Sequence, residues 1–277
     1  MWESGLTLQR SEDLSRASTG TVEFSIIVPT LNEEGSISHL LKSLQSQSFA
    51  NFEIILVDGG SQDGTAELAR SLGAKVFILR SSGEFEARNY AVLRSAAPIL
   101  VFSCADVIFP SSSLSTVRDR FQREPDLAAL TGPAVPYDGG IALRFIYGAY
   151  NVIRFLFSRM PSPLRAFSSS TNFLVVRRAV FLKTGGFRVD DVNADGMMGA
   201  FLAGRYPVSF ENDLLVFISG RRASNWGIAR FGLHYLYVLE NFFPGVSRQK
   251  WFRRFKNSSQ KSHGEIHTKA PTQSQVG

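Results

Sequence analysis

The first half of the chain alternates between short apolar runs and longer segments with helical spacing. Apolar runs typical of buried strands occupy residues 24–28, 52–58, 75–79 and 99–103. Between them, apolar residues recur every three or four positions, which predicts helices over about residues 33–47, 64–72 and 84–96. Strands that alternate with helices in this way predict an α/β fold with a mostly parallel sheet flanked by helices.

The second half follows a less regular pattern. Residues 141–157 are apolar and aromatic, and residues 141–165 contain four Arg and no acidic residue. Residues 171–178 predict a strand that enters a helix, and residues 195–204 predict a short helix. Residues 221–256 hold eight Lys or Arg against one Glu, with many aromatic residues between them. We therefore interpret residues 228–256 as a basic, aromatic, amphipathic helical tail.

Length and composition limit the class of protein. The chain has 277 residues, of which 44% are hydrophobic and 19% charged, enough for one large α/β domain or two small ones. Residues 1–22 are polar and predict a flexible leader without a signal peptide, and residues 257–277 predict disorder. No apolar stretch is long enough to predict a membrane span.

Charge and cysteine content indicate a cellular location and classes of partner, but no specific function. One cysteine cannot form an internal disulfide, which favours a reducing, cytoplasmic location. The net charge of +6 and the pI of about 9.6 favour partners that carry phosphate, such as nucleotides, nucleic acids or anionic lipids.

Two polar motifs follow the first two predicted strands. They are VPTLNEEGSI at residues 28–37 and LVDGGSQDGT at residues 56–65. Each has a structural interpretation of its own, with Asn32 and Asp63 as helix caps and Glu33 in a first turn. Neither matches a P-loop or a Gly-x-Gly-x-x-Gly fingerprint. The carboxyl ends of parallel strands share one sheet edge, so we expect both motifs at one ligand site.

Together the two motifs resemble those of the family-2 glycosyltransferases of the GT-A fold. The likeness continues in GEFEARNYAV at residues 83–92, in TNFLVVRRAVFLKTGGF at residues 171–187 and in ISGRRASNWG at residues 218–227. The likeness covers about residues 24–230. Within the family, the chain resembles membrane-associated transferases that act on polyprenyl phosphates or glycans. The resemblance implies a GT-A domain over residues 23–227, with a nucleotide-sugar half (23–110) and an acceptor half (111–227).

The resemblance also assigns roles to single residues. The base and ribose of a nucleotide-diphosphate sugar would lie against Pro29, Thr30, Asn32 and Glu33, and Asp58 would accept a hydrogen bond from the base. Arg88 would lie near the phosphates or the base. Carboxylates and amides suit the N–H and O–H groups of a nucleoside, and guanidinium groups suit a diphosphate. Arg221 and Arg222 would meet the charge of the leaving group.

The family's metal motif, Asp-x-Asp, is altered here to Cys104-Ala105-Asp106. Mg²⁺ and Mn²⁺ prefer oxygen ligands, and one carboxylate together with substrate phosphates can hold them. The resemblance therefore implies that Asp106 binds Mg²⁺ or Mn²⁺, while Cys104 is interpreted as a small buried residue. The alternative is that Arg221 and Arg222 carry more of the leaving-group charge.

An inverting sugar transfer needs a base for the acceptor. Alignment with the family places Asp195 at the catalytic position, with Ala194 in place of the usual Glu. Asp195 has a second interpretation as a helix N-cap, and Asp190 and Asp191 are neighbouring alternatives. An acceptor that is already a phosphate would need little help from a base.

The resemblance implies transfer of a hexose from a UDP- or GDP-sugar to a lipid-linked or glycan acceptor at the inner face of the membrane. The alternative functions are an inactive sugar-nucleotide-binding protein of the same fold, a nucleotidyltransferase, or a binding module. The basic aromatic segments suit an anionic membrane surface. For residues 141–165 the other interpretations are a core helix with its Arg residues outward and a nucleic-acid patch. No nucleic-acid fold signature is present, so no nucleic-acid partner is expected.

Overall fold

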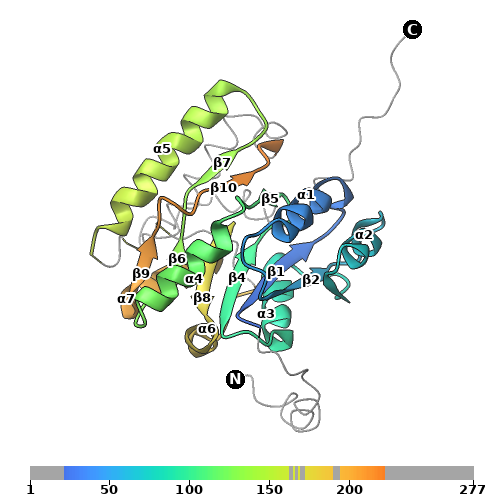
Figure 1. Ribbon diagram of the computed structural model, residues 1–277, viewed down its shortest axis with the longest axis horizontal. Helices are drawn as coiled ribbons and strands as arrows, with labels where there is room; N and C mark the ends of the chain where they lie inside the picture. Colours follow the sequence, from blue (N-terminus) through green and yellow to red (C-terminus); the bar gives the residue numbers. More distant parts are fainter. Residues whose placement is uncertain (1–21, 162–164, 166–167, 169–171, 190–193, 222–277) are drawn as a thin grey trace, which may run out of the picture.

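The computed structural model describes residues 22–161, 165, 168, 172–189 and 194–221 (Figure 1). Their centre is a sheet with the strand order β3-β2-β1-β4-β8-β6-β9. Its strands are β1 (Phe24–Thr30), β2 (Phe52–Asp58), β3 (Lys75–Ile78), β4 (Ile99–Ser103), β6 (Ala129–Thr131), β8 (Phe173–Arg177) and β9 (Val208–Phe210).

The register of the sheet brings the predicted motifs to one edge. Strands β3, β2, β1 and β4 run parallel, and β8 runs antiparallel to both β4 and β6. Within β1 and β2, Thr30 pairs with Asp58, so the two polar loops leave the sheet side by side. The mixed, mostly parallel sheet predicted from the alternating pattern is therefore confirmed.

Helices cover both faces of this sheet. One hydrophobic cluster joins Val28 of β1 to α1, α4 and α5, and a second joins Ile27 to α3, α6 and α7. Neighbouring residues of β1 thus point into opposite cores, as the period of two in a strand requires. The helices are α1 (Glu34–Gln45), α2 (Thr65–Ser71), α3 (Glu84–Arg94), α4 (Ser113–Arg123), α5 (Ile141–Ser158), α6 (Arg178–Thr184) and α7 (Ala194–Arg205).

A small second sheet lies next to two residues of the predicted site, Asp106 and Arg221. Its order is β5-β10-β7, formed by β5 (Val107–Ile108), β7 (Ala134–Pro136) and β10 (Val216–Ile218). β5 follows directly after Asp106, and β10 leads into Arg221. The sequence did not predict these strands, because two or three residues are too few to show a period. Helix α4 was also missed.

Candidate functional site

Asp58 organises the loop that follows β2. Its carboxylate is 1% exposed and accepts four hydrogen bonds. The backbone N–H groups of Gly60 and Ser61 donate to Oδ1 at 2.9 and 2.7 Å. The hydroxyls of Ser61 and Thr30 donate to Oδ2 at 2.5 and 3.0 Å. The resemblance implies that the nucleobase of the donor donates a hydrogen bond to Asp58. The nucleobase would have to replace or share one of these four donors.

The loop after β1 is locked to the loop after β2. Asn32 has a φ of 53°, the left-handed region that Asn tolerates better than most residues. Its N–H donates to Ser61 Oγ at 2.8 Å, and its Oδ1 accepts from the Gln62 N–H at 2.9 Å. The predicted N-cap role of Asn32 is therefore corrected: Glu33 occupies that position, and Asn32 bridges two loops instead.

The start of α1 is fixed by residues of the second loop. The Glu33 N–H donates to Thr65 Oγ1 at 2.8 Å, and the Glu34 N–H donates to Asp63 Oδ2 at 3.2 Å. Asp63 also accepts hydrogen bonds from the N–H and the hydroxyl of Thr65. The unsatisfied N–H groups of the first helical turn thus find acceptors about 30 residues away in the sequence.

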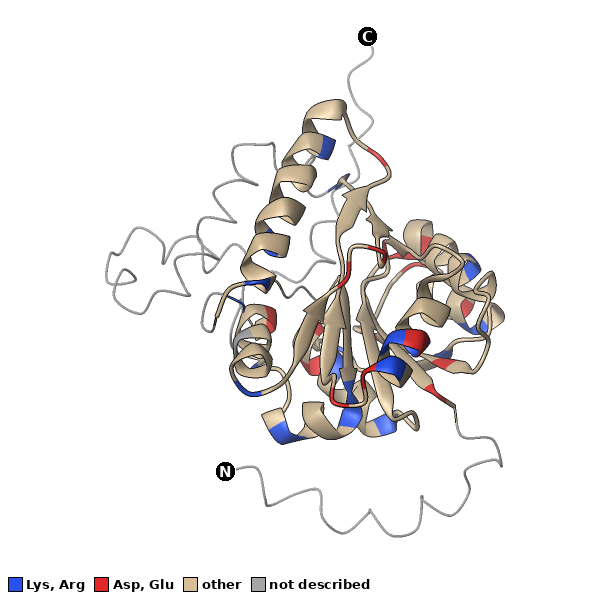
Figure 2. Ribbon diagram, turned by 60° about the vertical axis from the view of Figure 1, so that its left-hand side comes forward, with Lys and Arg blue, Asp and Glu red and all other residues tan. Residues whose placement is uncertain are grey.

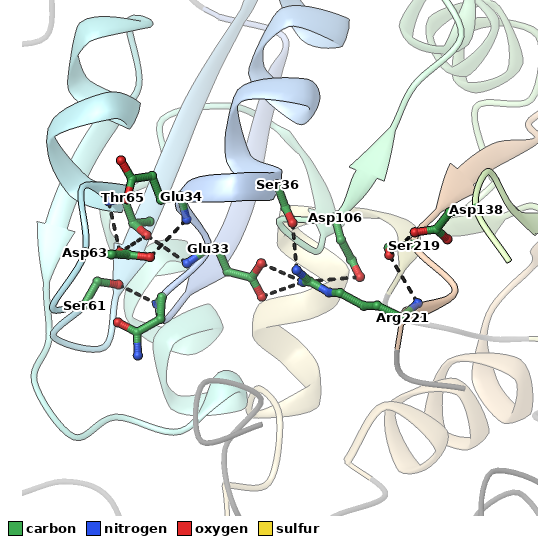
Figure 3. A network of polar contacts seen from close by, with 11 residues as sticks. Glu33, Glu34, Ser36, Ser61, Asp63, Thr65, Asp106, Asp138, Ser219 and Arg221 are labelled. Atoms are coloured by element: carbon green, nitrogen blue, oxygen red, sulfur yellow. Dashed lines mark hydrogen bonds and ion pairs between the residues drawn. The ribbon is translucent and has the colours of Figure 1, made fainter. Parts of the chain in front are cut away.

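Arg221 places a guanidinium group between two carboxylates. Its Nη2 lies 2.8 and 2.6 Å from the two oxygens of Glu33 and 3.7 Å from Asp106 Oδ2. Its Nη1 donates to Ser36 Oγ at 2.7 Å. Figure 3 shows Arg221 reaching from the end of the β10 segment to the start of α1. The pKa of Arg221 is raised, because attraction to Glu33 and Asp106 outweighs the cost of burial.

Asp138 holds the backbone in front of Arg221. Its Oδ2 accepts from the Ser219 hydroxyl at 2.7 Å, and its Oδ1 accepts from the Gly220 N–H (Figure 3). The Ser219 Oγ in turn accepts from the Arg221 N–H at 3.3 Å. No local sequence signal identified Asp138, because its partners lie 81 and 82 residues further along the chain.

Arg88 is buried beside the altered metal motif. Its side chain is fully buried, Nη2 lies 2.8 Å from Glu84 Oε1, and it donates to Ser103 O at 3.2 Å. Its guanidinium also faces the rings of Phe85 and Phe187 at 5.8 and 5.9 Å. Among the described residues, no hydrogen-bond acceptor meets its buried Nε and Nη1. The predicted contact of Arg88 with a nucleotide would need this cluster to open.

Cys104 connects Arg88 to Asn172, the residue directly before β8. Its Sγ lies 3.4 Å from Arg88 Nη2 and 3.5 Å from Asn172 Oδ1. It is half-buried, and it packs against the core cluster of β1. The thiol therefore stands next to a guanidinium group, at the position where the family motif has a carboxylate.

Asp195 lies in the first turn of α7, within the electrostatic reach of Glu84 and Arg88. Its Oδ1 accepts from the Gly196 N–H at 2.9 Å. Desolvation and the negative charge of Glu84 raise the pKa of Asp195, and Arg88 opposes the shift only in part. A raised pKa suits a carboxyl group that takes up a proton.

Only a limited metal site fits these residues. Within the described ranges, no group of three or more His, Cys, Asp or Glu side chains is arranged to hold an ion. Asp106 is partly exposed and offers one carboxylate, while Arg221 already lies 3.7 Å from it. The donor set thus fits a divalent ion only if the phosphates of a bound nucleotide supply further oxygens.

The structure places the predicted residues in two groups at one sheet edge. The first combines Thr30, Asn32, Glu33 and Asp58 with Asp106 and Arg221. The second combines Arg88 with Cys104 and Asp195. Pro29 lies half-buried at the end of β1, opposite Val57. Arg222, Asp190, Asp191, the leader and the tail lie outside the described residues.

Sequence reasoning missed Glu84 and Asn172. Glu84 precedes Arg88 by four residues on α3, and this spacing is a recognised signal for an ion pair on one helix face. Asn172 gave no such signal, since only the antiparallel pairing of β8 with β4 brings it to Cys104.

The fold and the polar loops at the sheet edge define the chain as a family-2 glycosyltransferase domain of the GT-A type. A family model described as Glycosyl transferase family 2 matches residues 25–181, more than half of the chain. The chain belongs to this family.

Relatives of known name support the assignment. A PGL/p-HBAD biosynthesis glycosyltransferase of Mycobacterium tuberculosis is 32% identical over 150 residues, 49% of this chain and 55% of that protein. A 4,4'-diaponeurosporenoate glycosyltransferase of Staphylococcus haemolyticus is 38% identical over 104 residues, 35% of this chain and 28% of that protein. The chain thus spans about half the length of the mycobacterial relative.

A solved structure shares the fold. A mannosyltransferase from Pyrobaculum calidifontis, in complex with GDP-Man and Mn²⁺, superposes with a TM-score of 0.61 at 18% identity. The match covers 92% of this chain and 74% of that one. At this identity the likeness concerns the fold.

Proposed function

We propose that this chain is an inverting glycosyltransferase that moves a hexose from a UDP- or GDP-sugar to a lipid-linked or glycan acceptor. One observation supports the proposal: the polar loops after β1 and β2 and the candidate catalytic carboxylate Asp195 belong to two charged groups, which the Cys104-Ala105-Asp106 segment joins. Glu33 and Asp106 both meet Arg221, and two residues before Asp106, Cys104 meets Arg88. Arg88 and Glu84 in turn act on Asp195.

The donor would bind across the carboxyl edge of the sheet. The base and ribose would lie against Pro29 and Thr30 at the end of β1 and against Asn32 in the loop that follows, which is already held in place by hydrogen bonds. Such loops need little ordering when a ligand binds, which favours affinity. Glu33 would accept from the ribose hydroxyls once its bond to Arg221 is shared or exchanged.

The diphosphate would lie near Arg221, with Arg222 as a further cation. A guanidinium group offers several N–H donors in a fixed plane, which suits phosphate oxygens. Its charge stabilises the leaving nucleoside diphosphate as negative charge develops on it. A Mg²⁺ or Mn²⁺ ion held by Asp106 and the donor's phosphates would supply further Lewis-acid stabilisation.

Asp195 is the proposed base. The acceptor oxygen attacks the anomeric carbon from the side opposite the diphosphate, and its proton passes to the carboxylate of Asp195. The bond between the anomeric carbon and the phosphate oxygen breaks, and its electron pair leaves with the nucleoside diphosphate. One attack from the opposite side inverts the configuration at that carbon.

The name of one relative supports the proposed lipid-linked acceptor. The staphylococcal relative is named as a 4,4'-diaponeurosporenoate glycosyltransferase. No helix in the described part of the chain is long and apolar enough to cross a membrane. The net charge of +6 leads us to propose peripheral association with the inner, anionic face of the membrane.

A donor panel tests the proposal. The full chain is incubated with radiolabelled UDP- and GDP-sugars and a polyprenyl phosphate acceptor, with Mn²⁺ or with EDTA. We expect one donor to support transfer with inversion, and EDTA to reduce the rate. Asp106→Asn should lose the metal response, whereas Asp119→Asn, an exposed carboxylate on α4, should keep it.

Two outcomes would contradict the proposal. Retention of configuration would exclude Asp195 as the base of a single displacement. Donor binding without any transfer would favour the alternative, an inactive sugar-nucleotide-binding protein of the same fold. The replacement of family carboxylates by Cys104 and Ala194 would then be the cause.

A further inference from the structure

The outer face of α5 is apolar and open to solvent. The side chains of this stripe recur along one helix face, at spacings of three, four and seven residues. We name the set the α5 stripe. It consists of Ile141, Phe145, Val152, Ile153 and Leu156, which are 76%, 72%, 58%, 48% and 52% exposed. Contiguous exposed apolar residues of this kind mark interaction surfaces.

The buried face of α5 carries an arginine. Arg154 is 1% exposed and donates to the Ser168 carbonyl at 2.8 and 3.0 Å and to Thr131 Oγ1 at 3.1 Å. Its guanidinium also lies 5.1 Å from the ring centre of Phe210. These contacts fix the rotation of the helix, because turning the stripe inward would pull a buried charge away from its acceptors. One interpretation of the sequence was a core helix with its arginines facing solvent. Arg154 contradicts it, because this arginine is buried while the apolar stripe is exposed.

The helix that carries the stripe lies in a segment of the sequence that is rich in arginine and lacks acidic residues. Residues 139–189 contain eight Lys or Arg and no Asp or Glu. Arg144 and Arg159 are exposed on and just after α5. In Figure 2 the ribbon of α5 carries blue segments and no red one. Apolar side chains flanked by arginines suit an interface with anionic headgroups.

We propose that the α5 stripe docks onto an anionic lipid leaflet, with α5 lying in the plane of the membrane. Charge complementarity favours this occupant over a second copy of the chain, since two such surfaces would bring like charges together. Docking of the basic segment 228–256 onto the stripe would likewise bring like charges together. The leaflet supplies both the apolar layer and the negative charge.

The position of α5 gives this docking a purpose. A Cβ on Gly220 would lie 2.5 Å from Leu143 Cδ2, so the first turn of α5 packs tightly against the residue that precedes Arg221. A docked α5 would hold the candidate site next to the leaflet. This inference rests on the membrane association in the proposed function, but it does not depend on the proposed sugar transfer.

Vesicle flotation of the full chain tests the inference. Vesicles of phosphatidylcholine alone are compared with vesicles that also contain phosphatidylglycerol. We expect binding only to the anionic vesicles, and a loss of roughly tenfold or more in Phe145→Gln/Leu156→Gln. The matched control is Ile78→Gln/Leu182→Gln, which changes two side chains of 45% and 44% exposure elsewhere and should bind normally. Arg144→Gln and Arg159→Gln should each cost about fivefold.

The outcomes separate this inference from the proposed function. Equal binding of the stripe variant and its control would overturn the inference, as would a concentration-dependent dimer that the stripe variant abolishes without any vesicle binding. Transfer to a short, water-soluble acceptor is measured in parallel. Loss of vesicle binding in a variant that keeps this transfer supports the inference, and so does the same loss in a chain that shows no transfer at all.

Discussion

Two polar regions at the same sheet edge differ in how completely their groups are satisfied. In the loops after β1 and β2, Asp58 meets four donors, and Asn32 and Asp63 bridge the two loops. In the cluster around Arg88, by contrast, two buried guanidinium nitrogens, Nε and Nη1, find no acceptor among the described residues. Within the part of the chain that the structure describes, the first region therefore satisfies its polar groups, while the second holds a buried charge that is only partly satisfied, which is costly.

We propose that the difference separates two tasks. A loop that must present backbone and side-chain groups to a nucleoside works best when it is held rigid in advance. A cluster that controls proton transfer needs a perturbed electrostatic environment, which full satisfaction would remove. On this proposal, the role of the loops costs the fold little stability, whereas the role of the Arg88 cluster costs more.

The largest expected effect lies in the Arg88 region, at Asp195. Asp195→Asn should lower the rate of sugar transfer about 10²–10⁴-fold, since the amide cannot accept the proton. Donor affinity, measured by calorimetry, should stay near that of the parent chain. Asp119→Asn is the control. Undiminished transfer by Asp195→Asn would remove this residue from the mechanism.

The next effect tests the loop region through stability. Asp58→Ala leaves four donors without their acceptor and should lower the free energy of unfolding by about 3 kcal/mol. Urea denaturation measures the change, with Asp119→Ala as the exposed control. A loss equal to that of the control would mean that the loops hold their shape without Asp58.

The pH dependence should show opposite signs for activity and stability. As the proposed base, Asp195 acts in its ionised form, so transfer should fall about tenfold per unit as the pH drops below its raised pKa. The folded chain binds this proton more tightly than the unfolded chain does. Stability from this group should therefore decline as the pH rises from about 3.9, the ordinary Asp value, to the raised pKa.

The check is a pair of pH profiles, one of the transfer rate and one of the urea midpoint. Asp195→Asn should flatten the contribution of this group to the stability profile. An acid limb of transfer that remains near the ordinary pKa of a carboxyl group would show that Asp195 is not perturbed in solution.

The smallest expected effect is a stability change in the Arg88 cluster, which is compared directly with the change in the loops. The double variant Glu84→Gln/Arg88→Met removes the i,i+4 ion pair together with the unsatisfied N–H groups. Replacing both partners of a buried pair is often neutral, so we expect a stability change under about 1 kcal/mol. Arg88→Met alone leaves Glu84 without its cation and should cost more. A double variant as unstable as Asp58→Ala would erase the distinction between the two regions.

Much of the fold was predictable because its signals are local. Apolar runs and helical spacing identified β1 to β4, α1 to α3, the segment of β8 and α6, and α7, whereas a helix was only one interpretation of the segment that forms α5. Strand ends in a parallel sheet share one edge, so the grouping of Thr30, Asn32 and Asp58 followed from the same pattern. The short strands and α4 escaped, since their pattern is brief or mixed.

The sequence by itself determined the order of strands and helices and the chemistry collected at their carboxyl ends. Only the tertiary structure decided that Arg221 would meet Glu33, 188 residues away, and that Arg88 would be buried against Cys104. It also turned Arg154 inward and the α5 stripe outward. Periodicity tells which residues share a face, whereas the packing of neighbouring elements decides which face is buried.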